Sequence, residues 1–212
     1  MKYTIATFLL LLTITACQNT RQLAPHTAQQ MVEASWQQEA HILWQIEWAA
    51  MPSGGPLTVE SWRAGERYRY EILEATAPAL VGEILIFDGQ TAWQYNHLSN
   101  EAFIIEAPTN EAPAPLPTPW LSPISDIFWS INQRLAEPPL KAEVRATELS
   151  HGPAQEISLI YAADETFILW QDEQTGLPAR LRFTANGAIV QLTARELDRL
   201  ADPPLELFQP VR

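Results

Sequence analysis

The residue whose side chain is best placed to undergo chemistry is Cys17, because it is the only cysteine among 212 residues and follows a distinctive apolar segment. It follows an apolar run, Leu9 to Ala16, that begins after one positive charge at Lys2 and ends in small residues. A short apolar core with a small-residue cleavage site is typical of a secretory signal, and the run is too short to span a bilayer comfortably. A lone cysteine in an exported chain cannot form an internal disulfide, so its position needs another reason.

The residues Ile14, Thr15, Ala16 and Cys17 resemble the lipobox of bacterial lipoproteins. The resemblance implies that residues 1–16 are a signal peptide and that the Cys17 thiol is acylated, for example with palmitate, and becomes the new first residue. Buried acyl chains contribute about 0.8 kcal/mol per CH₂, which would hold the mature protein on a membrane surface. The alternative is an ordinary signal peptide with an accidental cysteine.

The residue after the cysteine, Gln18, is not the aspartate that retains lipoproteins in the inner membrane of many enterobacteria. We therefore expect an exported, lipid-anchored protein of the cell envelope. Its place would be the periplasmic face of the outer membrane in a cell with two membranes, or the outer face of the plasma membrane in a cell with one.

No motif indicates catalysis, and we expect no catalytic residues, no metal and no cofactor. The histidines (His26, His41, His97 and His151) are scattered singly, without metal-site spacing. The chain has no Gly-x-Ser-x-Gly elbow and no glycine-rich phosphate loop. Asp88 is the one acid that invites a catalytic reading, but its place before Gly89 in a tight turn explains it.

The net charge and the composition argue against several other classes of protein. The formal net charge of −12 becomes −13 without Lys2, which argues against nucleic acid and against electrostatic docking on anionic lipid. No second apolar run is long enough for a transmembrane helix. A 47% hydrophobic content with eight tryptophans can supply a core without disulfides.

The periodicity predicts a mainly β domain over residues 27–212, preceded by a tether over residues 17–26. A helical pattern begins at Thr27, its expected N-cap, and places Ala28, Met31, Val32 and Trp36 on one face. The period then changes to two. Strands are expected at 42–48, 57–64, 67–73, 83–87, 90–96, 101–107, 141–149, 155–162, 166–171, 180–185 and 188–193.

Two hairpins are expected from Asp88-Gly89 and Asn186-Gly187. A two-residue type I′ turn at the first would pair Ile86 with Thr91 and Ile84 with Trp93. The second would group Leu181, Phe183, Val190 and Leu192 on one face, with Arg182 and Gln191 on the other. Each hairpin then has one apolar and one polar face, which is typical of a sheet with one face packed on a core and the other exposed to solvent.

The middle of the chain breaks the strand pattern. Residues 108–119 contain five prolines and are expected to form an extended crossing segment. Ser122-Pro123 resembles a cap followed by a first-turn proline and opens a helix to about Leu135. Its apolar stripe must cover another apolar surface; the stripe consists of Ile124, Ile127, Phe128, Ile131 and Leu135.

Apolar and aromatic side chains fall on one face of successive strands, where they either fill a dry core or line a cavity suited to an acyl chain. A broad sheet with only two helices as cover favours the cavity. Its expected lining is Trp44, Ile46, Trp48, Tyr68, Tyr70, Ile84, Ile86, Trp93, Tyr95, Phe103 and Ile105 from strands, with Ile127, Phe128 and Ile131 from the mid-chain helix.

The segments Phe87-Asp-Gly-Gln-Thr-Ala-Trp-Gln-Tyr95 and Trp170-Gln-Asp-Glu-Gln-Thr-Gly-Leu-Pro178, the Asn186-Gly187 hairpin and the proline-rich crossing with its helix resemble one family. It is the LolA-like superfamily of periplasmic lipoprotein carriers and their receptors, which includes sigma-factor regulatory sensors and lipid-carrier lipoproteins. The resemblance covers roughly residues 27 to 208. It implies an unclosed antiparallel β half-barrel, with the N-terminal and mid-chain helices in its concave face, that holds acyl chains.

Two functions follow as hypotheses, neither of them enzymatic. The first is an anchored lipoprotein that binds lipid, or the acyl chains of lipoproteins, as a carrier, receptor or sensor. The second is an envelope interaction or regulatory scaffold with a packed core, no ligand and a protein partner. Fold alone does not choose between them.

Overall fold

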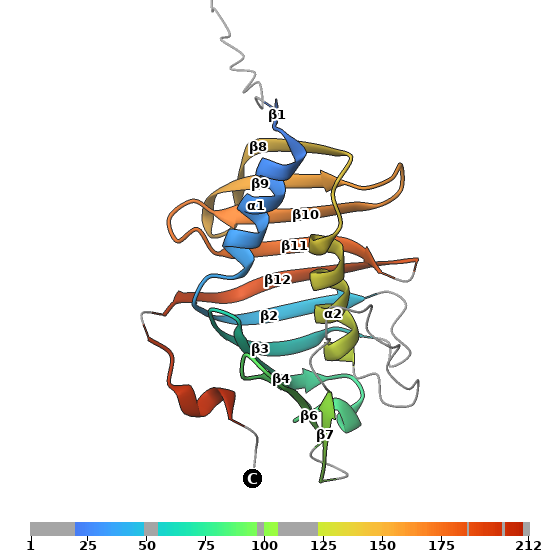
Figure 1. Cartoon of the computed structure of the whole chain (residues 1–212), viewed down its shortest axis with the longest axis vertical. Coiled ribbons are helices and arrows are strands. Elements are labelled where there is room, and N and C mark those ends of the chain that lie inside the picture. The colour runs from blue at the N-terminus through green and yellow to red at the C-terminus, as the bar shows by residue number, and fades with distance from the viewer. Residues whose placement is uncertain are drawn as a thin grey trace, which may run out of the picture.

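The computed structural model describes residues 20–48, 55–96, 100–105, 123–185, 187–200 and 202–209. These residues form one antiparallel sheet of twelve strands, in the order β1-β8-β9-β10-β11-β12-β2-β3-β4-β5-β6-β7 (Figure 1). The strands are β1 (Arg21–Gln22), β2 (Ala40–Trp48), β3 (Leu57–Ala64), β4 (Arg67–Ala75), β5 (Ile84–Phe87), β6 (Ala92–Asn96), β7 (Glu101–Ile105), β8 (Lys141–Leu149), β9 (Gly152–Ile160), β10 (Thr166–Asp172), β11 (Pro178–Ala185) and β12 (Ala188–Arg199). The end strands β1 and β7 do not pair with each other, so the sheet is not closed.

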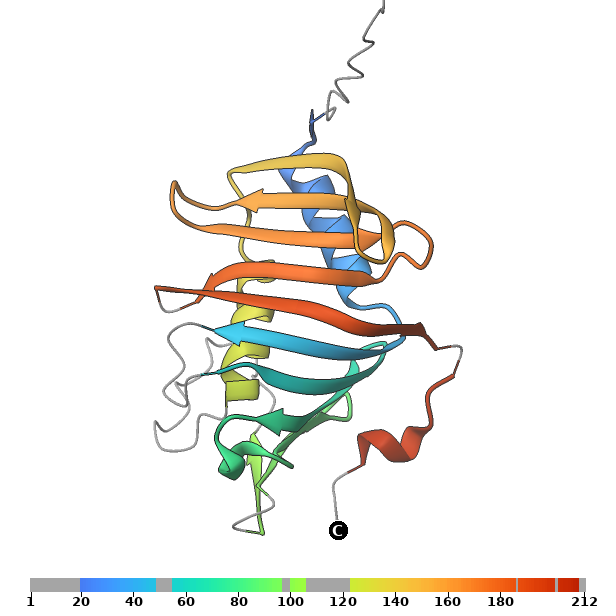
Figure 2. The same cartoon turned by 180° about the vertical axis from the view of Figure 1, so that it is seen from behind.

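Both α-helices of the described residues, α1 (Pro25–Trp36) and α2 (Pro123–Ala136), lie on the same face of the sheet (Figure 1). The view from behind shows the other face without a covering helix (Figure 2). Two short 3₁₀ turns, η1 (Pro78–Leu80) and η3 (Leu205–Phe208), complete the described elements. The expected mainly β half-barrel with two helices on one face is confirmed. We call that face the helix-covered face.

The core lies between this face and the helices. Along β2, buried and half-buried side chains alternate, with Ile42, Trp44 and Ile46 buried. All five residues of the expected apolar stripe on α2 are buried, and α1 buries Ala28, Val32, Ser35 and Trp36. Burying one apolar face of each element is the dominant favourable term in such a fold.

The β11–β12 register confirms the second hairpin. Leu181 pairs with Leu192, Phe183 with Val190, and Arg182 with Gln191. The four apolar residues are buried on one face. Asn186 lies outside the described residues, and Gly187 has a φ of +77°. β12 continues to Arg199 and pairs with β2, which joins the two halves of the sheet.

The predicted register of the first hairpin was wrong. Ile86 pairs with Trp93 and Ile84 with Tyr95, so the loop holds the four residues 88–91 and not two. Gly89 has a φ of +100°, but Asp88 is not at positive φ, which rules out a type I′ turn. The Asp88 carboxylate instead accepts hydrogen bonds from the backbone N–H groups of Gln90 and Thr91, both at 2.8 Å. This local side-chain bonding is an alternative that aspartate offers to a tight turn.

The expected start of α1 was also wrong. The helix begins at Pro25, with Ala24 and not Thr27 at the N-cap. Proline suits the first helical position because its missing N–H would have no partner there. β1, within the expected tether, pairs with β8 and was not predicted. The lipobox, Ser122 and the proline-rich segment lie outside the described residues.

Candidate functional site

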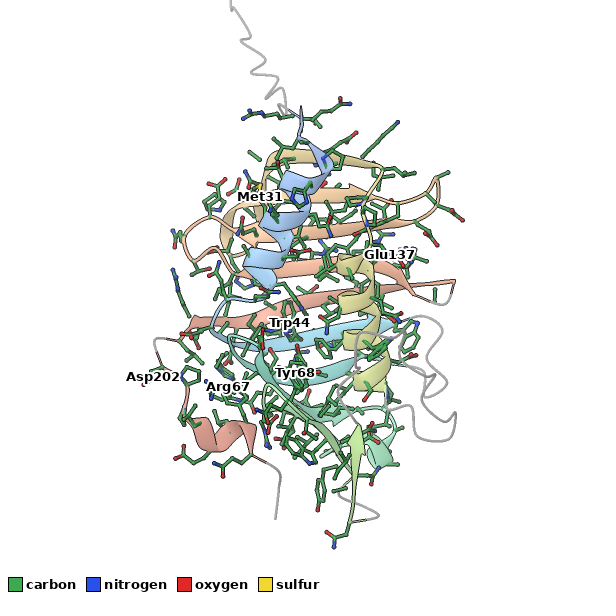
Figure 3. All side chains as sticks on the ribbon, in the orientation of Figure 1. Met31, Trp44, Arg67, Tyr68, Glu137 and Asp202 are labelled. Carbon is green, nitrogen blue, oxygen red and sulfur yellow. The ribbon has the colours of Figure 1, made fainter. Side chains whose placement is uncertain are left out.

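The helix-covered face brings together part of the expected lining. Trp44, Ile46 and Tyr70 are buried there, and Trp48 and Tyr68 are partly buried against the same core. Trp44 and Tyr68 come from β2 and β4 below the helices (Figure 3). From α2, the expected residues Ile127, Phe128 and Ile131 are all buried.

The other half of the expected lining lies elsewhere. Ile84 and Ile86 pair with Glu71 and Arg69, on the face opposite to Tyr70. Through the β5–β6 register, Trp93 and Tyr95 lie on that opposite face too, so the four residues do share a face but not the helix-covered one. Phe103 and Ile105 lie in β7, and their side chains are outside the described part of the chain.

Leu85 and Gln94 occupy the positions on the helix-covered face that had been expected for their neighbours. Leu85 pairs with Tyr70 and belongs to the core, and the Gln94 side chain accepts a hydrogen bond from Ser125 of α2 at 3.0 Å. Ile84, Leu85 and Ile86 are all apolar and all buried, so period-two patterning carries no signal for the face in this strand.

Phe128 is the central contact between α2 and the sheet. Its ring stacks on Tyr70 with centroids 3.6 Å apart and an interplanar angle of 12°. Phe128 also contacts Trp36 of α1, with a centroid distance of 6.1 Å. Trp36 in turn contacts Trp44 at 6.3 Å. Aromatic contacts of this kind therefore link both helices to β2 and β4.

Polar bonds to other described residues hold α2 near both of its ends. Apart from Ser125 to Gln94, Gln29 of α1 donates to the Leu135 carbonyl, and Arg134 bonds Glu165 at 3.1 Å. The Arg134 pair is partly exposed, so solvent screens it. The docking of α2 thus depends mainly on apolar contact.

Little free space remains beside the Phe128 stack among the described residues. A pocket beside the Phe128 stack, reached by Trp36, Arg63 and Tyr70, has a volume of about 10 Å³, which is roughly the space of one water molecule. Apolar cavities that take up small hydrocarbons are on the order of 150 Å³. An acyl chain would therefore have to displace side chains that now occupy this space.

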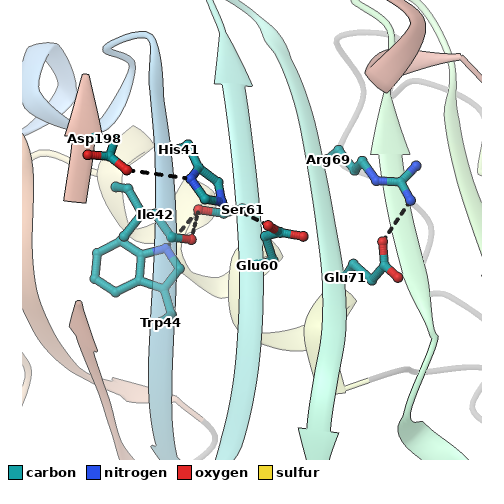
Figure 4. A network of polar contacts seen from close by, with 8 residues as sticks. All are labelled: His41, Ile42, Trp44, Glu60, Ser61, Arg69, Glu71 and Asp198. Carbon is teal, nitrogen blue, oxygen red and sulfur yellow. Dashed lines mark hydrogen bonds and ion pairs between the residues drawn. The ribbon is translucent and has the colours of Figure 1, made fainter. Parts of the chain in front are cut away.

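Polar contacts hold Trp44 on one face of the sheet and His41 on the other (Figure 4). The Trp44 indole Nε1–H donates to Ser61 Oγ at 3.0 Å, and Ser61 donates to the Ile42 carbonyl at 3.1 Å. On the opposite face, His41 bonds Glu60 at 2.9 Å and stacks on Trp62. His41 is therefore accounted for as a structural residue.

Burial sets the protonation of the tyrosines at this site. Desolvation raises the pKa of Tyr70, and the nearby Arg63 partly opposes the shift. Desolvation also raises the pKa of Tyr68, and the neighbouring Tyr70 raises it further. Both hydroxyls stay neutral at physiological pH and can donate hydrogen bonds.

Within the described ranges, no group of three histidine, cysteine, aspartate or glutamate side chains is placed to hold a metal. Among the same residues, no helix is long and apolar enough to cross a membrane. Cys17 lies outside them.

The open antiparallel half-barrel that the resemblance implied is the fold observed, and solved structures of low sequence identity share it. No protein-family model and no curated protein matches the sequence. An uncharacterised conserved protein from Thermus thermophilus superimposes with a TM-score of 0.57 at 14% identity, over 88% of this chain and 94% of that one.

MucB superimposes with a TM-score of 0.51 at 16% identity, over 88% of this chain. In the complex of MucA and MucB from Pseudomonas aeruginosa, the TM-score is 0.50 at 17% identity, over 87% of this chain. This chain spans 62% and 61% of the length of those matched chains. At such identities the likeness concerns the fold.

Proposed function

We propose that this protein is a lipid-anchored envelope protein that binds acyl chains on the helix-covered face, with α2 as a movable lid. The observation that carries the proposal is the position of Phe128. The Phe128 side chain of α2 contacts both Trp36 and Tyr70, while the polar bonds of α2 to other described residues lie near its two ends. A helix held in this way can be exchanged for another apolar occupant at a small net cost, because buried apolar area is replaced by buried apolar area.

The anchor is the second part of this proposal and rests on Ile14 to Cys17. Acylation at Cys17 would place the domain within reach of membrane lipids and of other lipoproteins. A carrier, a receptor or a sensor would each use such a position. No catalytic residue is needed for any of them.

A second function, a scaffold for a protein partner, is favoured by the packed interior. The pocket beside the Phe128 stack, at about 10 Å³, has no room for an acyl chain unless side chains move. MucB, which shares the fold, has been crystallised with MucA. In this alternative α2 completes a dry core and the partner binds outside it.

Titration with the fluorescent fatty acid cis-parinaric acid tests the proposal. The mature chain with Cys17→Ser avoids a contribution from its own lipid. Saturable uptake, with faster amide hydrogen exchange in α2 and unchanged exchange in β11 and β12, is expected for a lid. Absence of uptake would refute the acyl-chain proposal and leave the scaffold.

A further inference from the structure

The small pocket beside the Phe128 stack is polar on one side. It lies where the end of α1 meets β2, β3 and β4. Trp36 and Gln38 reach it from the end of the helix, and Arg63 and Tyr70 reach it from the strands. Two other polar side chains of the lining, Trp44 and Ser61, already have hydrogen-bond partners within the sheet. The Ser35 hydroxyl, which also lines the pocket, donates to the Gly176 carbonyl.

Arg63 is the cation of this pocket. Its guanidinium lies 4.7 Å from the centroid of the Trp36 ring and 5.9 Å from that of Tyr68, and it donates to the Tyr70 hydroxyl. No carboxylate among the described residues lies within ion-pair distance of it, although the chain carries a formal net charge of −12. The cation is held between aromatic rings with its charge uncompensated by any described residue.

Two buried donors accompany the cation. Trp36 is 5% exposed, and its Nε1–H has no acceptor among the described residues. Tyr70 is 2% exposed; its oxygen accepts from Arg63, which leaves the hydroxyl proton available, and burial raises its pKa so that the proton is retained. Buried donors without acceptors are unfavourable, and a ligand oxygen would satisfy both.

We propose that this pocket binds the carboxylate of a fatty acid whose chain takes the place of Phe128 beneath α2. The inference rests on the acyl-chain function proposed above and names its ligand class. A guanidinium binds a flat, two-oxygen carboxylate with paired hydrogen bonds. The pocket of about 10 Å³ has to widen to admit either group, and a planar carboxylate requires less widening than a tetrahedral phosphate ester. Gln38 donates from Nε2 to the Gly176 carbonyl, and its buried Oε1 has no donor among the described residues.

The test compares cis-parinaric acid with its methyl ester, which has the same chain without the charge. At pH 8, we expect the parent (mature chain, Cys17→Ser) to bind the acid about 10- to 100-fold more tightly than the ester, the range typical of charge-assisted bonds. We expect Arg63→Gln to remove the preference, because it weakens the binding of the acid and not that of the ester. Trp36→Phe keeps an aromatic ring but deletes the N–H donor, and it reduces the preference. Arg182→Gln, an exposed arginine on the opposite face, is the matched control and leaves the preference unchanged.

The outcomes separate the two proposals. Equal affinity of the parent for acid and ester, or a preference that survives in both Arg63→Gln and Trp36→Phe, overturns the carboxylate site while the acyl-chain function stands. No binding of either probe to the parent overturns both. If Arg63→Gln does not fold, as judged by circular dichroism, the parental preference and the Trp36→Phe titration still decide the question.

Discussion

Phe128→Ala distinguishes a lid from a core helix, because the loss of the same contact changes stability and probe affinity differently in the two cases. Phe128 is 2% exposed and the centroid of its ring lies 3.6 Å from that of Tyr70. Truncating a buried phenylalanine typically costs about 3–5 kcal/mol of stability. In a rigid core, the free energy of unfolding falls by that full amount.

A lid behaves differently. If the free energy that docks α2 is smaller than the truncation cost, the helix undocks and the loss of stability is limited to the docking energy. The open state then becomes the major one. Since about 1.4 kcal/mol corresponds to a factor of ten, the loss of a docking energy of about 2 kcal/mol raises the apparent affinity for an acyl chain roughly 25-fold. We therefore expect a stability loss below the core range, with tighter binding of cis-parinaric acid.

Phe167→Ala is the matched control. Phe167 is fully buried in β10, and its aromatic neighbour is Phe183, 6.0 Å away, so its truncation creates a cavity at a distance from the Phe128 stack. We expect the full core penalty and unchanged probe affinity. Urea melts and probe titrations on the parent and both variants are sufficient. Equal stability losses in the two variants, with no probe binding by any protein, would refute the lid and identify α2 as part of a dry core.

Three further predictions address the hairpin, the buried phenols and the anchor. Gly89→Val should destabilise the domain by about 1–3 kcal/mol, because Gly89 has a φ of +100° that a β-branched residue resists; an unchanged thermal midpoint would contradict this turn geometry. Burial raises the pKa of Tyr161 to about 12 and also raises that of Tyr70, so both hold their protons more tightly when folded. Their contribution to stability is thus complete below pH 10 and is lost as the pH rises towards 12, which denaturant melts at several alkaline pH values measure and which Tyr70→Phe should reduce. Cys17→Ser should abolish metabolic labelling by a clickable palmitate analogue and release the protein from the membrane fraction; labelling that persists would disprove the anchor.

Much of the fold was predictable because strand and helix periodicities are local. β3 and β8 begin and end at the predicted residues, 57–64 and 141–149. α2 was predicted from a proline at its start and from an apolar stripe at helical spacing, and that stripe is buried. The β11–β12 register followed from a polar and an apolar residue alternating on each strand. In each case the information lies within about twenty neighbouring residues.

The errors arose where the local sequence pattern does not distinguish between two arrangements. In Ile84-Leu85-Ile86 every side chain is apolar, so only pairing with β4 decides that Leu85 faces the helices. The length of the loop at residues 88–91 depends on hydrogen bonds of the Asp88 side chain, which compete with the tight turn that the dipeptide favours. The pairing of β1 with β8 joins segments about 120 residues apart, beyond any periodicity.

The sequence by itself determined most of the helices and strands and, through its resemblances, an open sheet and an expected anchor at Ile14 to Cys17. Only the tertiary structure decided what occupies the helix-covered face. Phe128 reaches Tyr70 across 58 residues of chain, and Arg63 of β3 meets Trp36 of α1. Such contacts depend on how packed elements fill space in three dimensions, and side-chain volume and charge at distant positions leave no periodic trace in the chain.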